Sequence, residues 1–334
     1  MTTVSFGDLA QSFLLKSQSS RLRGEVGRLT QELSSGKTAD PALGLSGDFT
    51  RLSALTRART ITDGYQSAAR EAAAQASATQ AALGTMSDKV QELIAPLLTA
   101  SQMEIPEQRA LIGSDARSRL NDVLSSMNTS VGGRALFAGV RIEGPAITDS
   151  DSLLAAVRGA MAGATTAEAA MAQISNWFDD PAGFAALAYL GDQPLADVAV
   201  AQTDKVWMGV TANDPAFRAM LTGLTAAALT ADAGNPLPTA ERRAFAQAAG
   251  TALLGAQAEM TQLAAKVGVS ESRIDTAQSR NAADLLTLEM AEAELVTSDP
   301  YRTATELEAV QTNLETVYAI TARLSRLSLT DFLR

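Results

Sequence analysis

The sequence predicts a mainly α-helical protein, in which the N- and C-terminal segments form a long antiparallel helical bundle or coiled coil around a small α+β insert. Three observations predict this fold. Aromatic residues make up only 4% of the 334 residues, while alanine and leucine are abundant. Both ends carry apolar residues at coiled-coil spacing, and the middle of the chain loses that spacing. Alanine is the residue that costs least to place in a helix.

The N-terminal third predicts two long helices. Leu22, Val26, Leu29 and Leu33 follow one another in steps of 4, 3 and 4 residues, and Leu15 lies one heptad before Leu22. Such spacing places the residues along one side of a helix. A longer seam of the same kind follows, made of Tyr65, Ala69, Ala72, Ala76, Thr79, Leu83, Met86, Val90, Leu93 and Leu97.

The C-terminal third repeats this pattern. No proline interrupts residues 241–297, and a new helix is expected to start at Asp299-Pro300. The first of these segments carries a seam with one irregular step: Phe245, Ala249, Ala252, Ala256, Leu263, Val267, Ile274, Ala277, Leu285, Leu288 and Leu295. The last segment carries Leu307, Val310, Leu314, Val317, Thr321 and Leu324.

The middle of the chain, between about residues 140 and 235, has a different pattern. Residues 152–178 predict one or two short helices. The segments 184–190, 195–201 and 205–211 predict short strands, because turn residues separate them. Gly132 and Gly133 indicate a turn, since no strand precedes them and no lysine follows, as a phosphate-binding loop requires.

Three structural regions follow from these boundaries. Residues 1–40 and 300–334 are expected to form a terminal helical assembly domain. Residues 41–139 and 240–299 are expected to form a helical bundle domain. Residues 140–239 are expected to form an outward-projecting α+β middle domain.

The composition excludes many kinds of chemistry. The chain has no cysteine and no histidine, which removes thiol nucleophiles, histidine triads and the common zinc sites. The net charge of −10 argues against nucleic-acid binding. No apolar run approaches the roughly 20 residues of a membrane span, and the first residues lack the pattern of a secretory signal. We expect no catalytic residues, cofactor or metal; an enzyme that uses carboxylates alone stays as an alternative.

The apolar seams of the two end segments predict an assembly surface. Two paired helices cover only one side of each other, so further apolar side chains need another surface. The alternative is that each residue belongs to an ordinary core within the chain. The residues expected to make assembly contacts are Leu15, Leu22, Val26, Leu29, Leu33, Leu314, Val317, Leu324, Leu327 and Phe332.

Several short motifs resemble the flagellin superfamily. LTQELSSGK at residues 29–37 is similar to the turn after the first helix of that family, and RLSRLSLTDFL at 323–333 is similar to its leucine-rich C-terminal end. GGRALFAG at 132–139, YLGD at 189–192 and VTANDPAF at 210–217 resemble the hook–filament junction proteins within it. Ala135 departs from this pattern, which usually has tyrosine there.

The resemblance implies a structural role in the bacterial flagellum. It implies an adaptor that joins hook to filament by helix packing in a tubular lattice, as a homo-oligomer. Its partners would be the first hook-associated protein, flagellin and an export chaperone. Export would follow the flagellar type III route to the cell exterior, without a cleaved signal. Flagellin itself, the filament subunit, is the alternative within the superfamily.

Overall fold

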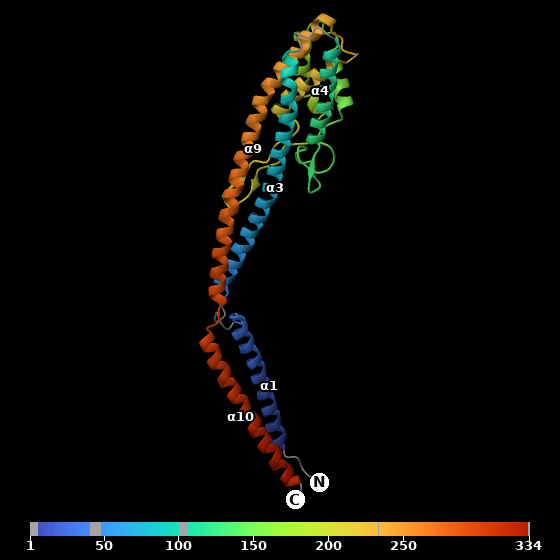
Figure 1. Ribbon diagram of the computed structural model, residues 1–334. Helices are drawn as coiled ribbons and strands as arrows, with labels where there is room; N and C mark the ends of the chain where they lie inside the picture. Colours follow the sequence, from blue (N-terminus) through green and yellow to red (C-terminus); the bar gives the residue numbers. More distant parts are fainter. Residues whose placement is uncertain (1–5, 41–47, 100–105, 233, 333–334) are drawn as a thin grey trace. The chain divides into compact units, whose positions relative to one another are not determined.

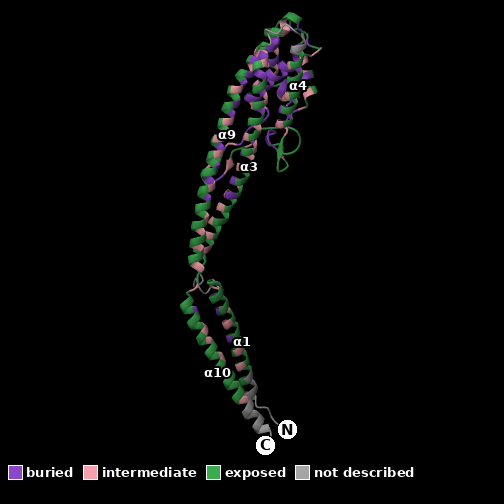
Figure 2. Ribbon diagram, in the orientation of Figure 1, coloured by how far each residue is buried: buried purple, intermediate pink, exposed green. Residues whose placement is uncertain are grey.

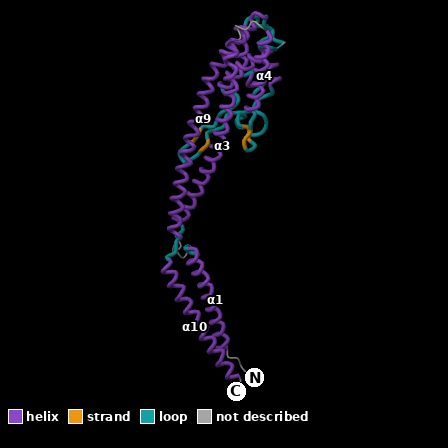
Figure 3. The backbone as a smooth tube through the Cα atoms, viewed as in Figure 1, coloured by secondary structure: helices purple, strands orange, loops and turns teal. Residues whose placement is uncertain are grey.

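A computed structural model describes residues 6–40, 48–99, 106–232 and 234–332 of the chain (Figure 1). Long helices dominate it, and the strands are only two residues long (Figure 3). The predicted fold class, mainly α with a small insert that contains short strands, is therefore confirmed. The elements in chain order are α1 (Phe6–Ser35), α3 (Thr50–Thr99), α4 (Pro106–Met127), β1 (Ser130–Val131), β2 (Arg134–Ala135), α5 (Ser150–Ala160), α6 (Ala167–Asp179), α7 (Phe184–Leu187), β3 (Val198–Ala199), β4 (Lys205–Val206), α8 (Pro215–Leu229), α9 (Thr239–Val296) and α10 (Pro300–Phe332).

The chain divides into two compact units. The first contains Met1–Thr62 and Ala283–Arg334, and the second contains Asp63–Ala282. Helices α3 and α9 contribute residues to both units, so neither unit boundary coincides with a loop. The division into three regions, with a separate domain at 140–239, stays a prediction.

The second unit is built around α8. This helix carries only one charged residue, Arg218, and its residues from Met220 to Leu229 are all buried. A helix that is apolar on every side is stable only when it is covered on every side. Helices α4, α5 and α6 pack against it, and Phe217 at its start meets the Phe137 ring edge-on at 5.3 Å. The purple region of Figure 2 corresponds to this core.

The predicted seam of α3 is buried in the second unit. All of its members from Ala69 to Leu97 are buried, while Tyr65 is half-buried. The seam of α9 is buried at Phe245, Ala249, Ala256, Leu263, Val267, Ile274 and Ala277. Four other members of the predicted seam are only half-buried: Ala252, Leu285, Leu288 and Leu295. The heptad spacing therefore predicts burial throughout α3 from Ala69 onward and in most of α9 up to Ala277.

One predicted strand is wrong. Residues 184–190 were expected to be extended, but Phe184–Leu187 form the single helical turn α7. Phe184 is fully buried, with its ring 5.3 Å from that of Phe178 and 6.2 Å from that of Trp177. An apolar run this short fits either a strand or a helix, and packing of these three rings decides in favour of the helical turn.

The other two predicted strands are present but much shorter. Only Val198–Ala199 and Lys205–Val206 pair, as an antiparallel hairpin. A second hairpin joins Val131 to Arg134 through Gly132 and Gly133, with φ angles of 59° and 80°. Two consecutive residues with positive φ are what a two-residue hairpin turn of this hand requires. The turn expected at these glycines is therefore confirmed.

Gly139 lies where two backbone segments come unusually close. Its φ is +66°, and a Cβ atom added there would lie 2.2 Å from the carbonyl oxygen of Gln193. Two hydrogen bonds hold the segments together: Val140 N–H donates to Gln193 O at 2.9 Å, and Asp192 N–H donates to Ala138 O at 3.0 Å. Any side chain at residue 139 must push these segments apart.

We therefore predict that Gly139→Ala destabilises the second unit by about 2–4 kcal/mol, because backbone strain and overpacking add there. Gly163 is the matched control, since its φ is +85° and an added Cβ would meet no atom within 4 Å. Gly163→Ala should cost only the strain, about 1–2 kcal/mol. Denaturant unfolding measures both values, and equal losses would show that the close approach at Gly139 is absent.

Candidate assembly surface

Helices α1 and α10 lie antiparallel and side by side within the first unit (Figures 1 and 3). Arg23 Nε–H donates a hydrogen bond of 2.6 Å to the hydroxyl oxygen of Tyr318. Lys37 and Thr297 form an antiparallel bridge at the other end of the pair. Arg23 and Tyr318 are 295 residues apart in sequence, so this contact and the bridge together fix the register of α1 against α10.

A single row of apolar side chains on each helix is buried between α1 and α10. Leu22 and Leu29 on α1 are 5% and 1% exposed, and Val317 on α10 is 5% exposed. Leu22 and Leu29 are seven residues apart, so they lie on the same side of the helix. Most other described residues of the pair are exposed or half-buried, as Figure 2 shows in green and pink. The pair therefore has a narrow core.

A buried carboxylate closes one end of the pair. Glu32 is only 5% exposed, and its Oε1 accepts hydrogen bonds from Arg28 Nη1 at 2.8 Å and from Ala39 N at 3.0 Å. A buried charge is tolerated only when it is paired in this way. Gly36, with a φ of 67°, then turns the chain out of α1.

The backbone continues this closure. Thr38 N–H donates to Val296 O at 2.8 Å, and Ser298 N–H donates to Gly36 O at 3.1 Å. These bonds, with the Glu32 contacts, form what we call the clasp: residues 32–39 and 296–298. Three residues of the LTQELSSGK motif, Glu32, Gly36 and Lys37, thus hold the end of α1 against the start of α10. Glu32 and the 296–298 side of the clasp were missed in the sequence, because heptad spacing says nothing about loop pairing.

The ten predicted assembly residues differ in how far the structure buries them. Leu22, Leu29 and Val317 are buried within the chain, and Leu33 is 40% exposed. The side chains of Leu327 and Phe332 lie outside the described part of the chain. Four residues are half-buried: Leu15, Val26, Leu314 and Leu324. Whether these ten residues make contacts with other copies stays a prediction.

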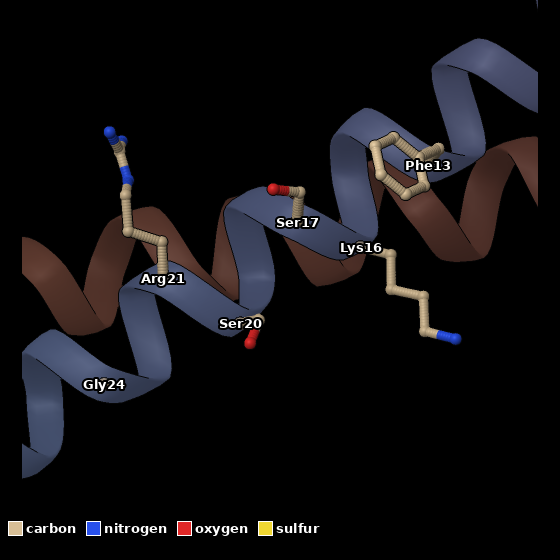
Figure 4. Close-up of a pocket in the computed structure, with 6 residues that line it drawn as sticks. All are labelled: Phe13, Lys16, Ser17, Ser20, Arg21 and Gly24. Atoms are coloured by element: carbon tan, nitrogen blue, oxygen red, sulfur yellow. The ribbon is translucent and has the colours of Figure 1, made fainter.

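Other apolar side chains are more exposed than the described members of the predicted set. Phe13 is 72% exposed, Leu14 66% and Ile320 43%. Phe13 lines a shallow hollow on the outside of α1, together with Lys16, Ser17, Ser20, Arg21 and Gly24 (Figure 4). Large apolar residues gathered on a surface are typical of protein contact sites. Phe13 and Leu14 fall off the leucine seam, so the seam did not predict them.

Nothing in this arrangement favours the carboxylate-only enzyme. None of the residues that line the hollow has a carboxyl group. Among the described residues, no three acidic side chains gather as a metal site would require. The adjacent carboxylates Asp179 and Asp180 serve local structure: Asp179 pairs with Arg218 at 3.0 Å, and Asp180 accepts from the N–H of Ala182 at 2.9 Å. None of the described helices combines the length and hydropathy that crossing a membrane requires.

The protein is mainly α-helical, and its paired terminal helices leave large apolar side chains exposed. Residues 251–333 match the family model of the bacterial flagellin C-terminal helical region. The fold is similar to that of a candidate flagellar hook-associated protein from Vibrio parahaemolyticus, with a TM-score of 0.52 and 14% identity over 77% of this chain and 98% of that chain. No curated protein matches the chain in sequence. Residues 251–333 therefore carry the C-terminal helical region of bacterial flagellins, and the fold is that of a flagellar hook-associated protein. Together, these findings support a structural component of the flagellum.

The Arg23–Tyr318 contact gives a measurable property to the helix pair. The hydrogen bond from Arg23 lowers the pKa of Tyr318 below its ordinary value, and a second one with Ser19 adds to the effect. The guanidinium stabilises the phenolate, so the shift exists only while α1 and α10 are paired.

We predict that Arg23→Gln raises the pKa of Tyr318 toward the ordinary value of about 10. Arg21→Gln is the matched control, because Arg21 lies on the hollow of α1 and makes no described contact with Tyr318. A pH titration of ring carbon shifts by NMR, with the protein labelled at tyrosine, measures both. An ordinary pKa for Tyr318 in the unmodified chain would show that the pair is not formed as described.

Proposed function

We propose that the protein joins the flagellar hook to the filament, by packing its terminal helices into a tubular lattice of identical copies. The observation that carries the proposal is the narrow core between α1 and α10, which leaves Phe13, Leu14 and Ile320 exposed. In a lattice these side chains would be covered by neighbouring copies. Each fully buried side chain of this size contributes about 1.5–3 kcal/mol.

The proposed setting follows from this role. The protein would lie outside the cell, after export through the flagellar type III route. On the hook side it would contact the first hook-associated protein, and on the filament side flagellin; before export it would bind a chaperone. The fold shared with the candidate hook-associated protein of Vibrio parahaemolyticus supports a position at the hook.

A filament subunit is the second candidate. The match of residues 251–333 to the C-terminal helical region of bacterial flagellin favours it. Antibody labelling of intact flagella separates the two. A discrete band at the hook–filament boundary is expected for the adaptor. Label along the whole filament would contradict the adaptor proposal and favour the filament subunit. An absence of label on flagella would contradict both proposals.

We predict that deletion of residues 323–334 abolishes assembly while the second unit stays folded. The deleted residues include part of α10 and none of Asp63–Ala282. Thermal unfolding followed by circular dichroism should retain the main transition. Electron microscopy of cells that make only the shortened chain should show hooks without filaments. Normal filaments on these cells would show that the C-terminal residues are not assembly contacts.

A further inference from the structure

The side of α1 that faces away from α10 carries a second row of residues. We call it the outer face of α1: Phe13, Ser17, Ser20, Gly24 and Gly27, in steps of 4, 3, 4 and 3. All five are exposed. At about 100° per residue, this row lies opposite Leu22 and Leu29, which α10 already covers. The outer face is therefore open in the single chain.

This outer face is shaped and charged to receive a helix. A Cβ atom added at Gly24 or Gly27 would meet no atom within 4 Å, so the space beside them is free. Lys16 and Arg21 flank the row on opposite sides, as the sticks in Figure 4 show. Neither forms an ion pair within the part of the chain that the structure describes. Lys16 and Arg21 are therefore available to pair with acidic side chains of a partner that packs on the shallow hollow.

Helix α10 carries the complementary row. Its outer face consists of Tyr301, Thr305, Glu308, Thr312, Glu315 and Ala319, also in steps of 4 and 3. Tyr301 is 86% exposed, and Glu308 and Glu315 are exposed as well. These two carboxylates lie opposite the inner residues Val310 and Val317, at about 100° per residue. They too have no ion-pair partner among the described residues.

We infer that the outer face of α1 in one copy binds the outer face of α10 in the next copy. The inference rests on the proposed function, since it specifies how copies meet in the lattice. Each copy offers both faces, so the contact repeats from copy to copy. Copies in one tube point the same way, which makes the two helices antiparallel across the contact.

The register within the chain sets which residues meet. Arg23 lies beside Tyr318, and Lys37 pairs with Thr297. For neighbouring copies at the same height, the Arg23–Tyr318 contact places Arg21 level with Ile320, and the Lys37–Thr297 bridge places it level with Asn313. Glu315 lies between these limits, so it is the acidic residue of the outer face within reach of Arg21. By the same register, Thr312 lies within the range that Gly24 faces. Opposite charges at such a contact favour the correct neighbour, and like charges disfavour a wrong one.

Cysteine cross-linking tests the contact directly, because the chain has no cysteine of its own. Full-length variants carry Thr312→Cys together with one of Ser17→Cys, Ser20→Cys, Gly24→Cys or Gly27→Cys. The four positions cover axial offsets of up to about two helical turns. Flagella that contain the variant are isolated and oxidised. At least one combination should give a ladder of cross-linked multimers, while Leu22→Cys with Val317→Cys on the inner faces should give cross-links within one chain only.

Absence of a ladder from all four combinations, in flagella that assemble normally under reducing conditions, would overturn the inference and leave the proposed function standing. If the unmodified protein is not found in isolated flagella, the proposed function itself is overturned. Charge reversal gives an independent measurement. Arg21→Glu alone and Glu315→Arg alone should each lower incorporation into flagella several-fold, and both changes in one chain should restore it. Failure of the double variant to recover, with normal circular dichroism, would also contradict the contact.

Discussion

A single apolar seam between α1 and α10 is the constraint on which the first unit depends. These helices are 30 and 33 residues long, yet Leu22, Leu29 and Val317 are the apolar side chains of the described part of the pair that are fully buried. Helix α8, with 15 residues, buries twelve. Long helices in water gain most of their stability from packing rather than propensity. The terminal pair therefore needs surfaces beyond its own, whereas the second unit has a complete core.

The clasp joins the C-terminal end of α1 to the segment just before α10. Glu32 forms an ion pair with Arg28 and accepts a hydrogen bond from the N–H of Ala39, and backbone hydrogen bonds join the segments around Gly36 and Ser298. These contacts are polar and local, so they hold the register of α1 and α10 without adding to their apolar core. A pair with a fixed register and an incomplete core is suited to packing against copies of itself.

The sequence predicted those features that depend on one residue's neighbours along a helix. The α3 seam from Ala69 to Leu97 and the turn at Gly132 and Gly133 were predicted because heptad spacing and glycine conformation are local properties. The helical turn at Phe184 was not predicted, since it depends on rings brought together from Trp177 and Phe178.

The candidate surface was predicted only in part, for the same reason. Leucine spacing identified the inner residues Leu22, Leu29 and Val317 but could not tell that the chain itself covers them. The exposed Phe13 and the Arg23–Tyr318 contact depend on how α10 lies across α1. The sequence predicted that the N- and C-terminal segments pair, but which of their residues meet and which stay exposed depends on the folded chain.

Hydrogen exchange on the monomer and on assembled flagella tests the central account most directly. If the narrow seam leaves the pair of α1 and α10 formed but only weakly stable, backbone amides of residues 10–35 and 300–324 should exchange orders of magnitude faster than those of α8 in the monomer. The same amides should become protected after assembly. Protection of the terminal helices equal to that of α8 in the dilute monomer would contradict the account.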